Sequence, residues 1–228
     1  MYFNRGWRRR TVALSVALLA GCLVLAGCSS RLDKEEETKT RDVPSYQLKA
    51  WSELHADPYQ ISERALRAYA YAAAAMDKAM PACKIGWSTL AGIGKVSSDN
   101  GSAGGASLAP DGTVSPAQRD LDQANPPKTP PLADTDAGKY DGNQLLDVTM
   151  GPMQILPSRW EQFATDADNN GKADPDNIDD ASLTAARFLC AAGGDLSKSD
   201  GWTAAMNQFN ATPGFAAKVH AIAAMYGR

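Results

Sequence analysis

The stretch LAGIGKVSSDNG, from Leu90 to Gly101, changes from apolar to polar along its length. Its residues at i, i+3, i+4 and i+7 share one helical face, and these are Leu90, Ile93, Gly94 and Ser97. Gly92 and Gly94 each destabilise a helix by about 1 kcal/mol relative to Ala, so we expect another segment to pack closely here. We expect the polar end, beginning at Ser97, to lie at the rim of a cleft. The alternative is a packing helix with a polar C-terminal cap.

The composition narrows the class of protein. The chain has 228 residues, enough for one medium domain with flanking segments. Its formal net charge is -3, and without the four arginines of its first 27 residues it has 19 basic and 26 acidic residues, a net charge of -7. Such an acidic protein is a poor candidate for nucleic-acid binding. Its two histidines, His55 and His220, are far apart in sequence, which argues against a histidine-based triad or a His-rich metal site.

The N-terminus has the pattern of an export signal. Four arginines precede an apolar run over Thr11–Gly27, and Cys28 follows. Leu25-Ala26-Gly27-Cys28 resembles a bacterial lipoprotein box. We therefore expect residues 1–27 to be a signal peptide and the domain to be anchored to the cell membrane through lipidated Cys28, facing the extracytoplasmic side and the cell wall. Leu19-Ala20-Gly21-Cys22 has the same four letters, but apolar residues come after Cys22, which favours Cys28; an uncleaved membrane anchor is the other alternative.

Residues 28–56 are predicted to be a lipidated, charged tether, because the run Arg31–Arg41 has no apolar spacing. Asp57 as an N-cap and Pro58 at the first helical position predict that a folded domain over residues 57–228 begins with a helix.

A loop over residues 102–148 is rich in Gly, Pro and Asp, and a loop of this length is functional or disordered. After it, Ser158 is predicted to cap a short helix. Apolar spacing predicts further helices at 178–192, 202–209 and 213–225. The predicted fold class is all-α, because no useful run of alternating residues is present.

Two cysteines remain after the N-terminal pair is assigned to the signal and to lipidation. Cys83 and Cys190 form an even pair in an oxidising compartment, which predicts a disulfide. The alternative is two buried free thiols.

The sequence DADNNGK over Asp166–Lys172 matches the first half of an EF-hand loop. Oxygen-bearing side chains stand at positions 1, 3 and 5, glycine at 6, and a carbonyl donor at 7: Asp166, Asp168, Asn170, Gly171 and Lys172. Position 12 holds Asn177 in place of the usual Glu, but Asp180 could close an enlarged loop. We therefore predict a calcium site, the alternative being a surface loop of Asx turns.

Five motifs are informative in combination: CKIGWSTLAGIGKV (Cys83–Val96), ADTDAGKYDG (Ala133–Gly142), TMGPMQILPSRW (Thr149–Trp160), DADNNGKADPDNIDDA (Asp166–Ala181) and AARFLCAAGGDL (Ala185–Leu196). With Phe209-Asn210, they resemble the lytic murein transglycosylases of the membrane-bound B type, especially exported actinobacterial forms. The resemblance covers roughly residues 82–228. It implies an α-helical, lysozyme-like fold with a groove for peptidoglycan glycan strands. It also implies cleavage between N-acetylmuramic acid and N-acetylglucosamine without water, which leaves a 1,6-anhydro end.

The resemblance assigns roles to individual residues. The saccharide groove would be formed by Gly151, Met153, Gln154, Phe209 and Asn210, with Phe209 in place of a common tyrosine. The family's enlarged calcium loop would correspond to Asp166, Asp168, Asn170, the carbonyl of Lys172, and Asp180. Cys83 and Cys190 fall where actinobacterial members have a cysteine pair.

The sequence departs from the family at Ser97, which stands in KVSSDNG where KVESDNG is expected. In the family that glutamate is both general acid and general base, and it needs a pKa raised by burial. A serine hydroxyl does neither near neutral pH. Asp99 is a candidate substitute, but it lies about 200° around a helix from Ser97. Asp136 and Asp141 are further candidates.

Three functional hypotheses remain. The favoured one is a degenerate transglycosylase that binds glycan strands with lost or weakened cleavage. The second is an active lytic transglycosylase that uses another carboxylate. The third is a non-catalytic scaffold for unidentified proteins of the cell envelope. Whether the chain is an enzyme therefore depends on Ser97.

Overall fold

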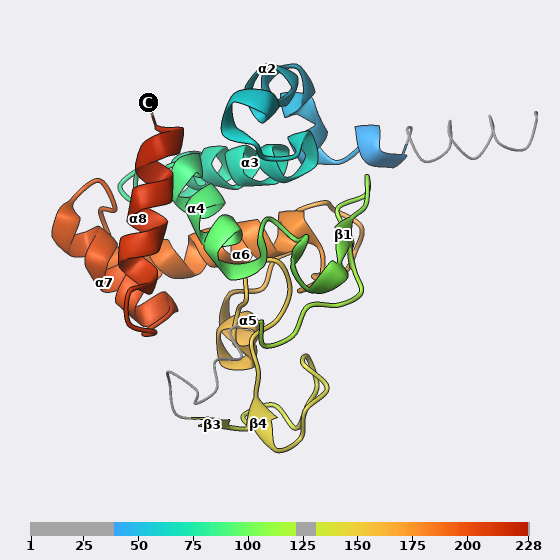
Figure 1. The fold of residues 1–228 in the computed structure, drawn as a ribbon, viewed down its shortest axis with the longest axis vertical. Helices are drawn as coiled ribbons and strands as arrows, with labels where there is room; N and C mark the ends of the chain where they lie inside the picture. The colour runs from blue at the N-terminus through green and yellow to red at the C-terminus, as the bar shows by residue number, and fades with distance from the viewer. Residues whose placement is uncertain (1–38, 122–130, 228) are drawn as a thin grey trace, which may run out of the picture. The chain divides into compact units, whose positions relative to one another are not determined.

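The computed structural model describes residues 39–121 and 131–227. The predicted signal peptide, Cys22 and the predicted lipidation site Cys28 lie outside the described residues. The fold is all-α, as predicted, and its elements are η1 (Pro44–Leu48), α2 (Lys49–Tyr59), α3 (Glu63–Ala79), α4 (Trp87–Ser98), η2 (Ala103–Gly105), α5 (Pro157–Phe163), α6 (Ile178–Gly193), α7 (Ser199–Phe209) and α8 (Phe215–Tyr226) (Figure 1). None of the helices in the described ranges has the length and apolar character needed to cross a membrane.

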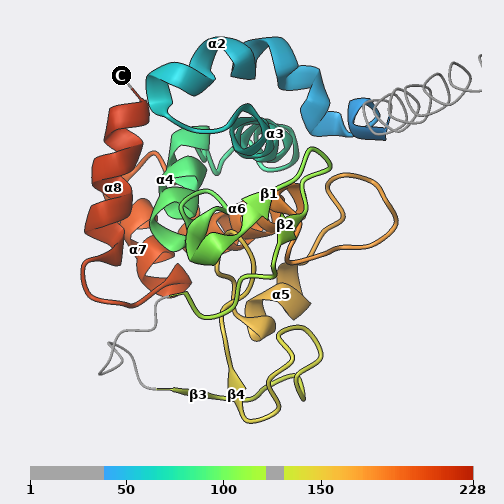
Figure 2. The same ribbon diagram turned by 45° about the vertical axis from the view of Figure 1, so that its right-hand side comes forward.

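The hydrophobic core lies between α3, α4 and α6. α3 packs along α6, α4 packs along α8, and α7 covers the far end of α6. Figures 1 and 2 show α2 lying across the outer side of α3, on the opposite side of the helical core from the hairpin of β3 (Leu132–Ala133) and β4 (Leu146–Asp147). The largest side chains that are completely withdrawn from solvent include Trp160, Tyr69 and Leu66.

The close packing predicted for the glycines of α4 is confirmed. A Cβ added to Gly92 would lie 2.9 Å from the carbonyl oxygen of Val219 on α8. A Cβ added to Gly94 would lie 2.0 Å from the hydroxyl oxygen of Tyr69 on α3. Both neighbours approach α4 closely because these positions carry no side chain.

The predicted disulfide is also present. Cys83 and Cys190 are bonded, with their Cα atoms 5.3 Å apart, and both residues are buried. The bond joins the segment before α4 to the end of α6.

The predicted start of the first helix is wrong. Pro58 lies inside α2, near its end, and the next helix begins at Glu63. Ser62 is its N-cap, and the Ser62 hydroxyl accepts a hydrogen bond from the Ala65 amide at 3.2 Å. The predicted domain boundary at residue 57 therefore falls within α2.

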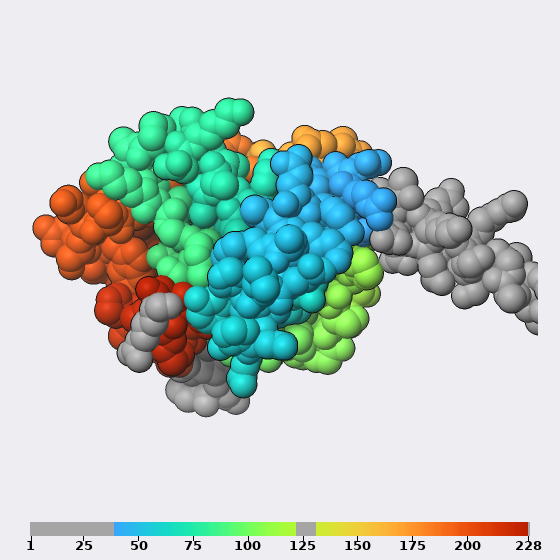
Figure 3. Space-filling view, turned by 90° about the horizontal axis from the view of Figure 1, so that it is seen from above, coloured from blue at the N-terminus to red at the C-terminus, as the bar shows by residue number. Residues whose placement is uncertain are grey.

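Aromatic side chains hold α2 against the rest of the fold. Trp51 and Tyr59, two turns apart on α2, both pack against Trp87 at the start of α4, with ring centroids 5.5 and 5.4 Å away. Tyr59 also packs against Tyr226 on α8, with the two ring centroids 5.6 Å apart. In the view from above, the blue residues of η1 and α2 cover the middle of this face, with α8 in red beside them (Figure 3).

The segment predicted as a long loop contains two very short hairpins. β1 (Ser107–Leu108) pairs with β2 (Val114–Ser115), and β3 (Leu132–Ala133) pairs with β4 (Leu146–Asp147), both antiparallel. The first hairpin is fastened to α6, because the Ile178 amide donates to the Gly112 carbonyl at 2.8 Å.

The predicted cap of the short helix α5 is wrong by two residues. Its N-cap is Leu156 in place of Ser158, and Pro157 occupies the first helical position, where its missing N–H costs nothing.

Candidate functional site

The C-terminal turn of α4 forms the centre of the candidate site. Ser97 is half-buried, and its hydroxyl oxygen is shielded from solvent without a hydrogen-bond partner. The next residue behaves differently: the Ser98 hydroxyl donates to the Pro152 carbonyl at 2.6 Å and accepts from the Gly101 amide at 2.9 Å. Ser98 therefore fastens the end of α4 to the turn that contains Gly151 and Gln154.

That turn has a backbone shape that requires glycine. Gly151 has φ +67°, and a Cβ added there would lie 1.7 Å from the Pro175 carbonyl oxygen. The Gln154 side chain fixes the same turn from inside, since its amide oxygen accepts from the Thr149 hydroxyl at 2.6 Å and the Leu121 amide at 2.8 Å. Its amide nitrogen donates to the Gly151 carbonyl at 2.9 Å. Gln154 is thus the buried, partnered amide that its apolar surroundings require.

The structure brings only some of the predicted groove residues together. Gly151 and Gln154 lie beside the end of α4, but Met153 is completely buried and its side chain packs in the core. Phe209 lies at the end of α7, with its ring centroid 6.0 Å from Phe188 and 6.2 Å from Phe215.

Asn210, which follows Phe209, caps α7 and accepts from the Thr212 amide at 2.8 Å. No hydrogen bond or ring contact within the described part of the chain joins Phe209 or Asn210 to Ser97 or Gln154.

Asp99 lacks the environment of a general acid. It follows α4 in the left-handed region, with φ 52°, and its carboxylate pairs with Lys95 and accepts from the Ser102 hydroxyl. The hydrogen bond from Lys95 lowers the pKa of Asp99 below its usual range. A general acid needs a raised pKa, so Asp99 is unsuited to that role.

The other candidate acids, Asp136 and Asp141, accept hydrogen bonds from backbone amides of their own loop. Asp136 accepts from the amides of Gly138 and Tyr140, and Asp141 accepts from the amide of Val148. Both belong to the β3–β4 hairpin, which Figures 1 and 2 show on the far side of α5 from α4. Their hydrogen bonds shape that hairpin.

The predicted metal loop brings three carboxylates together. Asp166, Asp168 and Asp180 each offer one oxygen, and the three oxygens lie within 4.8 Å of one another. Asp180 is completely buried in the first turn of α6 and reaches back to the loop, where it accepts from the amides of Ala167 at 2.6 Å and Asp174 at 2.8 Å. Calcium ligands lie about 2.3–2.6 Å from the ion, so oxygens with this spacing can share one ion.

The electrostatics of this loop also fit a cation. Burial raises the pKa of Asp168, and it raises the pKa of Asp180 to about 7, with the neighbouring acids adding to the effect. The nearby ammonium of Lys172 pairs at 2.9 Å with Asp174, outside the trio. The donors available are carboxylate, amide and carbonyl oxygens, the set that calcium prefers.

The structure brings together a second group of carboxylates, of which the sequence motif ADTDAGKYDG contains two. The side-chain oxygens of Asp134, Asp136 and Asp147 also lie within 4.8 Å of one another. Asp147 arrives from β4 and accepts from the Thr135 amide at 2.8 Å. Its place beside the other two depends on the pairing of β3 with β4, for which the sequence has no signal.

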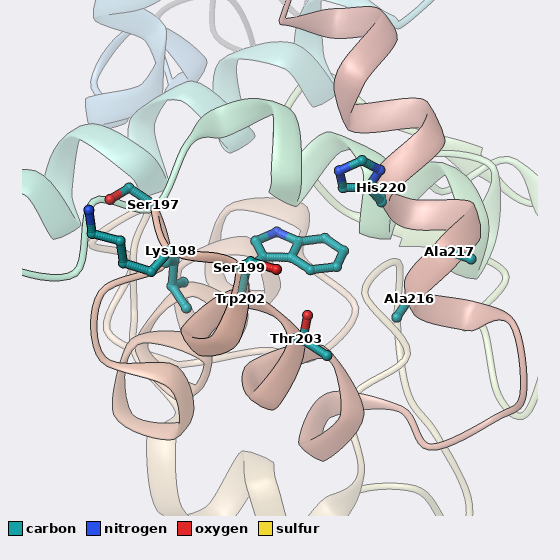
Figure 4. A pocket seen from close by; sticks show the side chains of 9 residues that line it. Ser197, Lys198, Ser199, Trp202, Thr203, Ala216, Ala217 and His220 are labelled. Atoms are coloured by element: carbon teal, nitrogen blue, oxygen red, sulfur yellow. The ribbon is translucent and has the colours of Figure 1, made fainter.

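Two surface cavities lie away from the predicted groove residues and from both groups of carboxylates. One of about 520 Å³ opens between α7 and α8 (Figure 4), and one of about 450 Å³ lies beside α2 and α3. None of the residues that line either cavity belongs to the predicted groove. Nothing in the apolar periodicity of α7 and α8 indicated the larger cavity.

Comparison with known families gives one match. Residues 148–220 match the family model of the transglycosylase SLT domain. The matched part begins before Gly151, contains the acidic loop and ends in α8, whereas Ser97 lies outside it. No curated protein and no solved structure was found to match the chain. The match covers 73 of the 228 residues, and it shows that this part of the chain is similar to a transglycosylase SLT domain.

Proposed function

We propose that this chain is an exported lipoprotein whose transglycosylase-like domain binds glycan strands of peptidoglycan and has lost or weakened their cleavage. The family match at residues 148–220 supports the choice of ligand. The observation that carries the proposal is the unpartnered hydroxyl of Ser97, at the end of α4, where the resemblance requires a carboxyl group.

The chemistry of the site supports the loss of cleavage. Breaking a glycosidic bond without water requires one group that protonates the leaving oxygen and then removes a proton from the sugar. General acid–base catalysis contributes about 10²–10⁴-fold to a rate, and Ser97 supplies neither part of it. Asp99 remains ionised beside Lys95, so it does not replace the acid.

The anchor and the metal complete the proposal. Lipidation of Cys28 would hold the domain at the outer side of the cell membrane, close to its ligand. Calcium would be held by Asp166, Asp168, Asn170, the carbonyl of Lys172, and Asp180. The bound ion would supply the positive charge that holds three carboxylates together. Gly151 touches the end of this loop through Pro175, so an ordered loop would also fix the turn beside α4.

The test uses purified protein and isolated peptidoglycan. Sedimentation with the insoluble polymer measures binding, and mass spectrometry of the soluble fraction detects 1,6-anhydro products. We expect the natural chain to sediment and to release none, and Ser97→Glu to sediment and release them. Ser88→Glu, which adds the same charge in the first turn of α4, is the control and should release none.

Each other outcome has a distinct meaning. Release of anhydro products by the natural chain as fast as by Ser97→Glu would overturn the lost or weakened cleavage and show that another carboxylate acts. Failure of the natural chain to sediment would overturn glycan binding and favour the envelope scaffold. Binding without any cleavage by Ser97→Glu would show that more than the acid has been lost.

A further inference from the structure

The cavity between α7 and α8 is separate from the candidate site. It is about 520 Å³ in volume, within the range of about 300–1,000 Å³ typical of ligand pockets. Its central side chain, Trp202, donates from its indole nitrogen to the Thr89 hydroxyl at 3.3 Å. Thr89 is in the first turn of α4 and Ser97 in the last, so the cavity lies at the opposite end of that helix.

Trp202 is held in one orientation. The hydrogen bond to Thr89 fixes the nitrogen edge of the indole, and His220 on α8 meets it edge-on, with ring centroids 5.6 Å apart and planes at 81°. The indole is nevertheless only half-buried and lines the cavity (Figure 4). An aromatic surface that is already ordered loses little entropy on binding, which favours stacking of a flat apolar ligand face upon it.

The remaining lining has both apolar and polar groups. The methyl groups of Ala216 and Ala217 come from α8, and the hydroxyl of Thr203 comes from α7 (Figure 4). Sugars present the same combination, with C–H faces that stack on aromatic rings, hydroxyls that exchange hydrogen bonds, and acetamido methyls that pack on alanine.

Lys198 adds a positive charge at one side of the cavity. It is the N-cap of α7, where the helix dipole also favours an anion. Two acids are close in sequence. Asp195 is engaged by Lys84 at 2.8 Å and by the Ser197 hydroxyl at 2.6 Å, and Asp200 is exposed in the first turn of α7. Among the residues that line the cavity, Lys198 is the lysine, next to the imidazole of His220, and its positive charge suits a carboxylate on the ligand.

We infer that this cavity is an accessory sugar site that binds an N-acetylated amino sugar carrying a carboxylate, stacked on Trp202 with its acid toward Lys198. The inference rests on the proposed function, because a peptidoglycan strand presents such a sugar wherever the stem peptide has been removed from the lactyl group of N-acetylmuramic acid. The domain would then hold a strand at a second place, away from Ser97.

The test is a titration with a soluble disaccharide of N-acetylglucosamine and N-acetylmuramic acid, followed by NMR of the tryptophan indole N–H groups. Trp202→Phe identifies the Trp202 signal by its disappearance. We expect that signal to shift saturably, while the signal of fully buried Trp160 stays in place.

A cavity-filling variant and a charge variant test the site and the ligand class. Ala217→Trp adds an indole from an exposed position and should weaken binding at least about tenfold, since it occupies the space of the ligand. Ala224→Trp is the control, because it is exposed on α8 about two turns away and outside the lining. Lys198→Ala should weaken the acidic probe about tenfold and leave the neutral disaccharide of N-acetylglucosamine unaffected.

The outcomes separate this inference from the proposed function. A stationary Trp202 signal, or equal binding by Ala217→Trp, in a protein that still sediments with peptidoglycan would overturn the accessory site alone. Equal weakening of both probes by Lys198→Ala would overturn the carboxylate contact. If the natural chain binds neither the probe nor peptidoglycan, the proposed function fails and the accessory site with it.

Discussion

Arg64 on α3 and Asp179 on α6 form a salt bridge in the protein interior. Both terminal nitrogens of the guanidinium group meet the carboxylate, one of them at 3.0 Å, and the two side chains are only 8% and 1% exposed. The remaining guanidinium nitrogen of Arg64 donates to the Pro110 carbonyl at 2.9 Å. One arginine therefore joins α3 and α6 to the turn of the β1–β2 hairpin.

Removing Arg64 should be strongly destabilising. Arg64→Ala leaves the Asp179 carboxylate buried without its cation, and such a loss costs about 3–5 kcal/mol of unfolding free energy. Urea unfolding followed by circular dichroism measures it. Lys49→Ala, which breaks an exposed pair with Glu53, is the control and should barely change the midpoint. Similar midpoints for the two variants would show that the buried pair contributes little.

The contact between Gly94 and Tyr69 predicts a second effect. Gly94→Ala should improve helix propensity by about 1 kcal/mol, yet its Cβ would lie 2.0 Å from the Tyr69 hydroxyl. Tyr69 is completely buried and donates to Asn100 at 3.1 Å, so it cannot move aside. We expect a net loss of about 1–3 kcal/mol in the free energy of unfolding.

A double-mutant cycle tests the cause. Tyr69→Phe removes the hydroxyl and should recover part of the loss caused by Gly94→Ala. Recovery should be incomplete, because a ring carbon would still lie 2.7 Å from the new Cβ. If the two substitutions instead add independently, the clash is not the reason for the loss.

The disulfide predicts a third effect. Its cysteines are separated by 107 residues in the sequence, and closing a loop of that length stabilises the fold by about 4–5 kcal/mol in the chain-entropy model. The double variant Cys83→Ala with Cys190→Ala should lose stability of this order in urea unfolding. A reducing agent should lower the natural chain to a similar value and leave the variant unchanged. Equal stability of variant and oxidised chain would contradict the prediction.

The sequence predicted best the features whose signals are local. The glycines of α4 indicated close packing without identifying α8 and Tyr69 as the neighbours. The disulfide followed because only two cysteines remained to pair. The start of α3 was missed because Asp57-Pro58 and Ser62 are both plausible helix starts, and only the packing of α2 decides between them.

Other features depend on residues far apart in the sequence. Trp51 and Tyr59 have the spacing of one helical face. Their packing partners, Trp87 and Tyr226, are identified only by the structure. The pairing of Arg64 with Asp179 spans 115 residues. The cavity at Trp202 is lined by α7, by α8 and by the segment before α7, and no periodicity within either helix reveals how these segments lie together.

The acidic loop leads to the last prediction, which tests the proposed calcium site. Calcium added to chelator-treated protein should raise the melting temperature. An ion at a free concentration 100 times its dissociation constant stabilises the folded state that binds it by about 2.7 kcal/mol. Asp166→Asn removes one of three converging carboxylates and should abolish most of the shift. Asp200→Asn, an exposed acid in the first turn of α7, is the control and should retain it. Calorimetric titration should give one ion per chain. An equal thermal shift in the Asp166 variant, or none in the natural chain, would show that the three carboxylates do not hold calcium.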